Sequence, residues 1–223
     1  MALESRFSDV LGATVHWTDY GGPPAPAAVL VCVHGLGGCA ANWDLWGPLM
    51  ARTHRVVALD LVGFGLTEAG QRQATVAANT ELLTEFLRTI HARTGHLDAD
   101  LPVLLVGNSM GGLIAANVIS TGGARPAGLV LVNPAAPHVG YGSALFPVFG
   151  LPYAGEFLGL ALYGTPFASA LVAQYATMLR SPEQTANDLF WMCVQNQDTV
   201  TQSLIDKHAG IIAHQRGRRG INL

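Results

Sequence analysis

The segment Val103–Gly112 constrains the fold of this chain more than any other. An apolar run from Val103 to Val106 is followed by Gly107-Asn-Ser109-Met-Gly111 and then by a helical pattern of small and apolar residues over Leu113–Ile119. This order predicts a buried strand, a sharp turn and a helix. Glycines allow so tight a turn because a Cβ there would clash with the adjoining strand and helix.

Ser109 occupies the centre of this predicted turn, which fits the pattern G-x-S-x-G. A residue so placed directly precedes a helix, where the N–H of Met110 and the helix dipole favour a negative charge. We therefore interpret Ser109 as a candidate nucleophile and the Met110 N–H as a candidate oxyanion donor. The alternative is a glycine-rich strand–helix turn with an incidental serine.

The flanking segments predict an α/β fold with a mostly parallel sheet and helices on both faces, because strand and helix patterns alternate. The first strand should form a hairpin with the residues before Gly12. The expected strands are Val10–Tyr20, Val29–Val33, Val56–Leu61, Leu101–Val106 and Leu129–Val132, and the expected helices between them include Asn42–Met50 and Thr75–His91.

Two further glycine-punctuated loops follow predicted strands. His34-Gly35-Leu36-Gly37-Gly38 comes after the second strand, and Asp60-x-x-Gly63-x-Gly65 comes after the third. Both loops should lie at the carboxyl end of the sheet, where ligand sites of α/β proteins are found. The N–H of Leu36 is therefore a candidate for a second oxyanion donor, and we expect Asp60 to bond loop backbone.

The composition changes near residue 136, so we divide the chain into a core over 1–135 and a cap region with a tail over 136–223. Glu156 is the only formally charged residue from Pro126 to Leu179. Phe157–Leu179 is long enough for a membrane span, but its glycines, proline and polar residues favour an apolar helical cap over a pocket. Peripheral contact with lipid stays open. Ser181-Pro182 should start a helix, helical patterns continue to about Gln215, and the residues beyond should fray.

Charge and cysteine content exclude several classes of function. The net charge of −3 gives no reason to expect nucleic-acid binding. The first nine residues lack an apolar segment of signal-peptide length, so we expect a cytoplasmic protein. Cys32, Cys39 and Cys193 are scattered and lack zinc-ligand spacing. Neither a metal nor a cofactor is implied.

Taken together, these motifs resemble the α/β-hydrolase family, with His34-Gly35, Asp60-x-x-Gly63-x-Gly65 and the elbow around Ser109 in family order. The resemblance covers residues 8–135 well and the later residues only as a variable cap. It implies that Ser109 is the nucleophile and that Leu36 and Met110 supply the oxyanion N–H groups. His34, Gly35, Gly37 and Trp43 would line the substrate side, with His34 shaping the loop and not acting as base.

The base and acid that a serine nucleophile needs are not secure in this sequence. We find no late strands leading to a glycine-flanked aspartate and a loop histidine, as if the fold were incomplete at its carboxyl end. His138 and His214 are the candidate bases, with His208 as a further one. Asp206 and His214 would lie about 12 Å apart along a helix, too far to bond directly.

Two functions from different classes remain open from the sequence, and within the enzyme class C–C bond hydrolysis and cofactor-free peroxidase-type chemistry stay open as well. The first is a serine hydrolase that cleaves an ester-like bond of an apolar small molecule through an acyl-enzyme. The second is a catalytically incomplete hydrolase-like chain that binds an apolar ligand or partner without turnover. If no strand follows Leu129–Val132, that strand is an apolar sheet edge, which would favour self-association.

Overall fold

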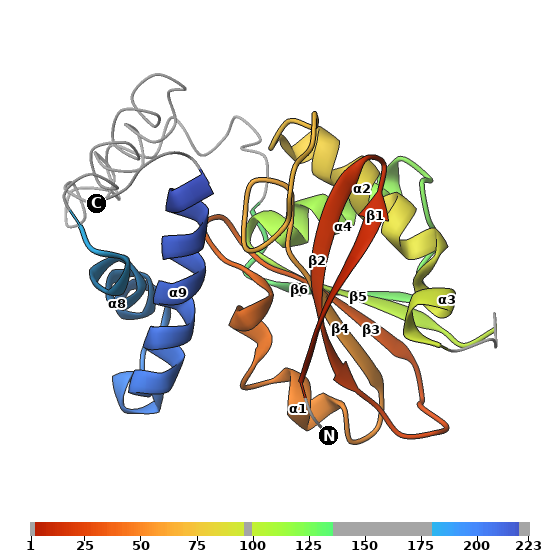
Figure 1. The fold of residues 1–223 in the computed structure, drawn as a ribbon. Helices are drawn as coiled ribbons and strands as arrows, with labels where there is room; N and C mark the ends of the chain where they lie inside the picture. The colour runs from red at the N-terminus through yellow and green to blue at the C-terminus, as the bar shows by residue number, and fades with distance from the viewer. Residues whose placement is uncertain (1–2, 96–99, 136–179, 219–223) are drawn as a thin grey trace, which may run out of the picture. The chain divides into compact units, whose positions relative to one another are not determined.

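The computed structural model describes residues 3–95, 100–135 and 180–218 (Figure 1). The chain divides into two compact units, Met1–Ala135 and Ala136–Leu223, which are described separately below. His138 and the apolar segment Phe157–Leu179 lie outside the described residues. Within the described ranges, none of the helices has the length and apolar character needed to cross a membrane.

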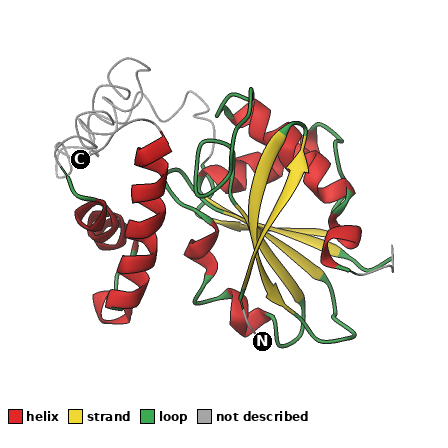
Figure 2. Ribbon diagram, in the orientation of Figure 1, coloured by secondary structure: helices red, strands yellow, loops and turns green. Residues whose placement is uncertain are grey.

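The first unit is built on a six-stranded sheet, drawn in yellow in Figure 2. Its order is β1-β2-β4-β3-β5-β6, and the pairs β3–β4, β3–β5 and β5–β6 are parallel. This confirms the predicted α/β class with a mostly parallel sheet. The strands are β1 (Glu4–Val10), β2 (Ala13–Gly21), β3 (Val29–Val33), β4 (Arg55–Leu59), β5 (Val103–Asn108) and β6 (Gly128–Val132).

The antiparallel part of the sheet begins with the hairpin of β1 and β2. Leu11 and Gly12 form its two-residue turn, with φ of 53° and 77°. Positive φ at both turn residues matches the right-handed twist of the flanking strands. The strand that we predicted from Val10 therefore begins at Ala13, because Val10 closes β1 opposite it.

Helices cover both faces of the sheet, as predicted (Figure 1). One face packs against α2 (Val76–Arg88), α3 (Ile90–Thr94) and α4 (Met110–Ser120) through the larger apolar cluster, which includes Val31, Leu83 and Phe86. The other face packs against the 3-10 helix η1 (Ala40–Trp43) and α1 (Gly47–Met50) through a smaller cluster that includes Cys32 and Trp43.

Two predicted helices are each divided in the structure. The expected Asn42–Met50 helix is η1 followed by α1, because Pro48 at the start of α1 begins a new helix instead of continuing the old one. The expected Thr75–His91 helix is α2 and α3, separated by Thr89, whose φ of −113° and ψ of 7° are not helical. Thr75 caps α2 by accepting a hydrogen bond from the Ala78 N–H.

Strand β6 is the outermost strand of the described sheet next to β5. The apolar run Leu129–Val132 predicts a strand that is buried when another strand follows it and an apolar edge when none does; Val130, Leu131 and Val132 are 49%, 44% and 42% exposed. Burial is therefore wrong for these three residues, because no described strand pairs with the outer side of β6. An apolar edge of this kind is a site where another strand can add.

In the second unit, the described residues form α8 (Pro182–Cys193), the short 3-10 helix η3 (Gln197–Thr199) and α9 (Gln202–Arg218). The predicted start of α8 is confirmed, since Ser181 and Gln184 form a capping box with Pro182 in the first turn. The predicted fraying from residue 216 is wrong for the first residues. Arg216 is buried and donates to the Arg180 carbonyl at 2.6 Å and to Thr185 Oγ1 at 2.8 Å.

Candidate active site

Ser109 lies at the sharp turn between β5 and α4, with φ of 49° and ψ of −118°. A positive φ is strained for a residue with a side chain, by ~1–3 kcal/mol. Hydrogen bonds hold the backbone in place: the Ser109 N–H donates to the Val132 carbonyl at 3.0 Å, and the Ser109 carbonyl accepts from Gly112 at 3.0 Å and Ala135 at 2.9 Å. The surrounding fold therefore imposes the strained turn.

Close packing explains the glycines around Ser109. A Cβ on Gly107 would lie 2.6 Å from the Gly112 Cα, and a Cβ on Gly111 would overlap the carbonyl oxygens of Val33 and His34. Real side chains do not tolerate such contacts with backbone, so only glycine fits at either position. Strand β5, helix α4 and the end of β3 thus approach each other as closely as their backbones allow.

The loop after β3 lies directly against this turn. A Cβ on Gly35 would be 3.0 Å from Ser109 Cβ and 2.9 Å from Asn108 Oδ1. The N–H groups of Leu36 and Met110 have no hydrogen-bond acceptor in the described part of the chain. For Met110 this follows from its place at the start of α4, where an intrahelical acceptor does not exist. Two donors without an acceptor are therefore next in sequence to the two residues in contact here, Met110 after Ser109 and Leu36 after Gly35.

His34 is fully buried and uses both ring nitrogens. Nδ1 bonds the Gly35 carbonyl at 2.7 Å, so it carries the hydrogen, and Nε2 accepts the Leu61 N–H at 3.1 Å. Burial lowers the pKa of His34 below its ordinary value, although the nearby Asp60 carboxylate opposes this. A neutral ring with both nitrogens occupied can hold the loop but cannot accept a proton from Ser109.

Asp60 follows β4 and connects the neighbouring loops. Its Oδ1 accepts the Ala40 N–H at 2.5 Å, and its Oδ2 accepts the Leu66 N–H at 2.7 Å, which confirms the predicted bonding to loop backbone. Its Oδ2 is also 2.7 Å from Nδ1 of the buried His16 on β2. Sequence reasoning missed this contact, because only the placement of β2 beside β4 brings the two residues together.

Trp43 lies in η1 and is only 8% exposed. It belongs to the smaller apolar cluster, and its ring centroid is 5.6 Å from that of Trp46. Gly37, in the loop beside Ser109, is exposed and has a φ of 74°. Contact of Trp43, Gly37 and the other predicted lining residues with a substrate stays a prediction.

A base for Ser109 is not found among the described residues of the first unit. The Ser109 hydroxyl has no hydrogen-bond partner there. His214 is exposed on α9, and His208 on the same helix bonds the Leu204 carbonyl at 2.9 Å and contacts the Phe190 ring at 4.8 Å. Asp206 and His214 share one unbroken helix, as expected. Across the described ranges, no three His, Cys, Asp or Glu residues gather as metal ligands would.

The strand–turn–helix around Ser109, with the His34 loop beside it on a mostly parallel sheet, defines a class of enzyme fold. A sequence model of this class, described as the alpha/beta hydrolase family, matches residues 30–212. The chain therefore belongs to the alpha/beta hydrolase family. At this level the chain is hydrolase-like.

Known proteins agree with this family. The chain is 35% identical over 128 residues to the dihydrolipoyllysine-residue acetyltransferase component of the acetoin cleaving system of Pseudomonas putida, covering 57% of this chain and 32% of that protein. It is 29% identical over 159 residues to the 2-hydroxy-6-oxo-6-(2'-aminophenyl)hexa-2,4-dienoic acid hydrolase of Metapseudomonas resinovorans, covering 70% and 51%. The chain spans between 32% and 51% of the length of the curated relatives it matches.

A solved structure shows the same fold. The structure of a serine hydrolase involved in carbazole degradation superimposes with a TM-score of 0.65 at 20% identity, covering 99% of this chain and 67% of that one.

Proposed function

We propose that the chain is a serine hydrolase that cleaves an ester-like bond of an apolar small molecule through an acyl-enzyme. The observation that carries the proposal is the strained Ser109 turn, flanked by the unused N–H groups of Leu36 and Met110. Folds hold such strain where a function requires it, and paired backbone donors stabilise the oxyanion of acyl transfer.

The chemistry would proceed in two steps. Ser109 Oγ attacks the carbonyl carbon, and the Leu36 and Met110 N–H groups stabilise the negative oxygen that forms. The leaving group departs with a proton, and water then releases the acid and regenerates Ser109. We assign the proton transfer to His138 or His214, the two first candidates among the histidines that follow Ser109 in the chain. The relative from Metapseudomonas resinovorans is named a hydrolase, which supports hydrolysis as the reaction class.

The alternative is binding of an apolar ligand without turnover. It is favoured by one observation: within the described residues of the first unit, no histidine bonds the Ser109 hydroxyl. The apolar composition around Phe157–Leu179 fits an apolar ligand under either function. We also propose that the protein is cytoplasmic. Fractionation of cells that produce the chain would test this localisation.

Labelling with a fluorophosphonate tests the proposal, because this probe reacts with activated serine hydroxyls. The labelled peptide is identified by mass spectrometry in the unaltered chain, in Ser109→Ala, and in Ser120→Ala as a control on α4. We expect label at Ser109 in the first and third proteins. Loss of that label in His138→Ala or His214→Ala would identify the base. A folded chain without label at Ser109 would favour binding without turnover.

A further inference from the structure

A second serine, far from Ser109 in the sheet order, lies against a histidine and an aspartate. Ser5 is on β1, and its Oγ is 2.7 Å from His16 Nε2. His16 Nδ1 is 2.7 Å from Asp60 Oδ2. Ser5 is exposed, whereas His16 and Asp60 are buried. The three side chains therefore form one continuous series of hydrogen bonds from solvent into the core.

Strand register produces this arrangement. Ser5 pairs with Thr18, and Phe7 pairs with His16, so Ser5 and His16 are diagonal neighbours on one face of the hairpin. Asp60 reaches the same face from the end of the adjacent strand β4, where its backbone N–H donates to the His16 carbonyl at 2.9 Å. Because the contact is built on strands, its geometry is fixed by the sheet.

The hydrogen bonds set the direction of proton transfer. In the tautomer with its hydrogen on Nδ1, His16 donates that N–H to the Asp60 carboxylate, and Nε2 accepts from the Ser5 hydroxyl. Asp60 is itself held by the Ala40 and Leu66 N–H groups, and the Phe7 ring lies 5.0 Å from the His16 ring. A held imidazole beside a hydroxyl is the arrangement that activates a serine.

We propose that Ser5 is a second nucleophile, which accepts acyl groups from activated esters. Its Oγ forms the new bond to the acyl carbon, and the bond from that carbon to the leaving oxygen breaks. The serine proton passes to His16 Nε2 and from there to the departing alcohol or phenol. Water then attacks the acyl group, which leaves as the acid, and the Ser5 hydroxyl is restored.

The class of acyl donor follows from what surrounds Ser5. The part of the chain that the structure describes shows no glycine-rich turn with two free N–H groups beside Ser5, such as the one beside Ser109. Ser5 thus has a neighbouring base, but the described residues offer it no pair of oxyanion donors. Acylation of Ser5 therefore requires an ester with a good leaving group. Ser5 is exposed on the outermost strand, where a small phenyl ester can reach it.

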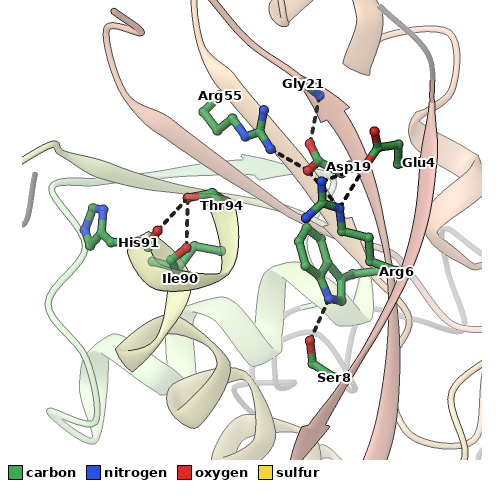
Figure 3. Close-up of polar contacts among 10 residues, drawn as sticks. Glu4, Arg6, Ser8, Asp19, Gly21, Arg55, Ile90, His91 and Thr94 are labelled. Carbon is green, nitrogen blue, oxygen red and sulfur yellow. Dashed lines mark hydrogen bonds and ion pairs between the residues drawn. The ribbon is translucent and has the colours of Figure 1, made fainter. Parts of the chain in front are cut away.

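Ser8 offers a matched control on the same strand. Its Oγ accepts the indole N–H of Trp17 at 3.0 Å, a bond that Figure 3 draws at Ser8, and among the described residues no hydrogen bond joins the Ser8 hydroxyl to His16. Ser8 and Ser5 therefore differ in whether a histidine ring faces the hydroxyl, and Ser8 is also half-buried whereas Ser5 is exposed. Replacing either by alanine removes one oxygen from β1 and leaves its pairing with β2 unchanged.

The test uses p-nitrophenyl acetate with the full chain carrying Ser109→Ala, so that its outcome is separate from that of the proposed function. Acetyl esters are located by peptide mass spectrometry, and treatment with hydroxylamine distinguishes them from amides on the amino terminus or Lys207. Thermal unfolding confirms that each variant is folded. The compared proteins are Ser109→Ala alone and the same protein with Ser5→Ala or with Ser8→Ala.

We expect ester at Ser5 in the Ser109→Ala protein, formed at least about tenfold faster than at Ser8, since a positioned base contributes ~100- to 10,000-fold. Adding Ser5→Ala should abolish this ester, and adding Ser8→Ala should leave its rate unchanged. An ester at Ser5 that forms no faster than one at Ser8 would overturn the proposal. So would a folded Ser109→Ala protein without any ester at Ser5.

Discussion

The two serines of the sheet have complementary surroundings. Ser109 lies in a strained turn next to the outer strand β6, with the unbonded N–H groups of Met110 and Leu36 in the turn and in the adjoining loop, and without a base among the described residues of the first unit. Ser5 lies on a regular strand at the opposite outer position, β1, with a base and an acid in hydrogen-bond contact. Within the described residues of the first unit, each serine thus has a part of an acyl-transfer site that is not found beside the other.

The difference shows which parts of such a site a sheet can form locally. Oxyanion donors require a backbone turn whose N–H groups remain free, so they depend on glycines and on a helix start. A serine–histidine–aspartate contact requires only three side chains on one face of adjacent strands. The turn with oxyanion donors can be recognised as a local motif in the sequence. The serine–histidine–aspartate contact cannot, because it depends on which strands are neighbours in the sheet.

Removing the Asp60 carboxylate, which bonds two neighbouring loops through Ala40 and Leu66, should have the largest effect on the free energy of unfolding. Asp60→Ala leaves the Ala40 and Leu66 N–H groups and His16 Nδ1 without their acceptor, so we expect a loss of ~3–5 kcal/mol in the free energy of unfolding. Urea denaturation measures it, with the exposed Asp9→Ala as control. Equal effects of the two substitutions would show that Asp60 does not join the loops.

Filling the contact behind Ser109 should have the next largest effect. Gly111→Ala places a Cβ against the Val33 and His34 carbonyl oxygens, and overpacking of this kind costs ~1–3 kcal/mol. Gly210→Ala is the matched control, because that α9 glycine has open space around it and alanine favours the helix by ~1 kcal/mol. We expect unfolding midpoints that shift in opposite directions. A stabilised Gly111→Ala protein would contradict the described packing.

Low pH should lower the free energy of unfolding because His34 becomes protonated on unfolding. Burial lowers the pKa of His34, so the native ring is neutral at pH values where the unfolded ring binds a proton. Stability therefore falls as pH drops below ~6.5, by up to ~1.4 kcal/mol per pH unit. Urea midpoints at pH 7.5 and pH 5 measure the loss. An NMR titration in which the His34 ring protonates near pH 6.5 in the folded protein would disprove this origin.

Releasing the backbone strain at Ser109 should give a smaller and opposite effect. Ser109→Gly adopts a positive φ without strain, so we expect a gain of ~1 kcal/mol after the greater flexibility of unfolded glycine is subtracted. Ser120→Gly, at the helical end of α4, should lose ~0.5–1 kcal/mol. Thermal unfolding compares them. A destabilised Ser109→Gly protein would mean that the turn is not strained.

The smallest effect on stability concerns the exposed edge β6. We propose that this edge associates with a second copy of the chain, and that Leu131→Lys weakens the association while changing the free energy of unfolding by less than ~0.5 kcal/mol. Sedimentation velocity over a range of concentrations measures it. Ile119→Lys, which places the same charge on α4, is the control. A monomer at every concentration before substitution would refute the proposal.

Local patterns predicted most of the sheet unit. Apolar runs located β3, β4 and β5, and the spacing of Gly107 and Gly111 around Ser109 located the strained turn. The errors have local causes: Pro48 and Thr89 divide helices whose apolar spacing continues across them. The exposure of β6 could not be predicted from its composition, because an apolar strand has the same sequence pattern at the centre of a sheet and at its edge.

The two candidate sites also differ in how far they could be predicted from the sequence. The Ser109 turn and the His34 loop are each contiguous in sequence, so their placement followed from the motif. The contacts of Ser5, His16 and Asp60 join segments up to 44 residues apart, and they depend on β2 pairing with β4 and not with β3. Contacts of this kind require the strand order, which hydrophobic periodicity does not contain.

The strand order also has a consequence for folding during synthesis. The hairpin of β1 and β2 pairs residues that leave the ribosome almost together, whereas β3 pairs Val29 with Val103. The central strand therefore remains without one of its neighbours while some seventy residues are made, a delay of several seconds at ~5–20 residues per second. During that interval the N–H and C=O groups of β3 that later pair with β5 stay without their partners, beside apolar side chains that are buried in the finished sheet.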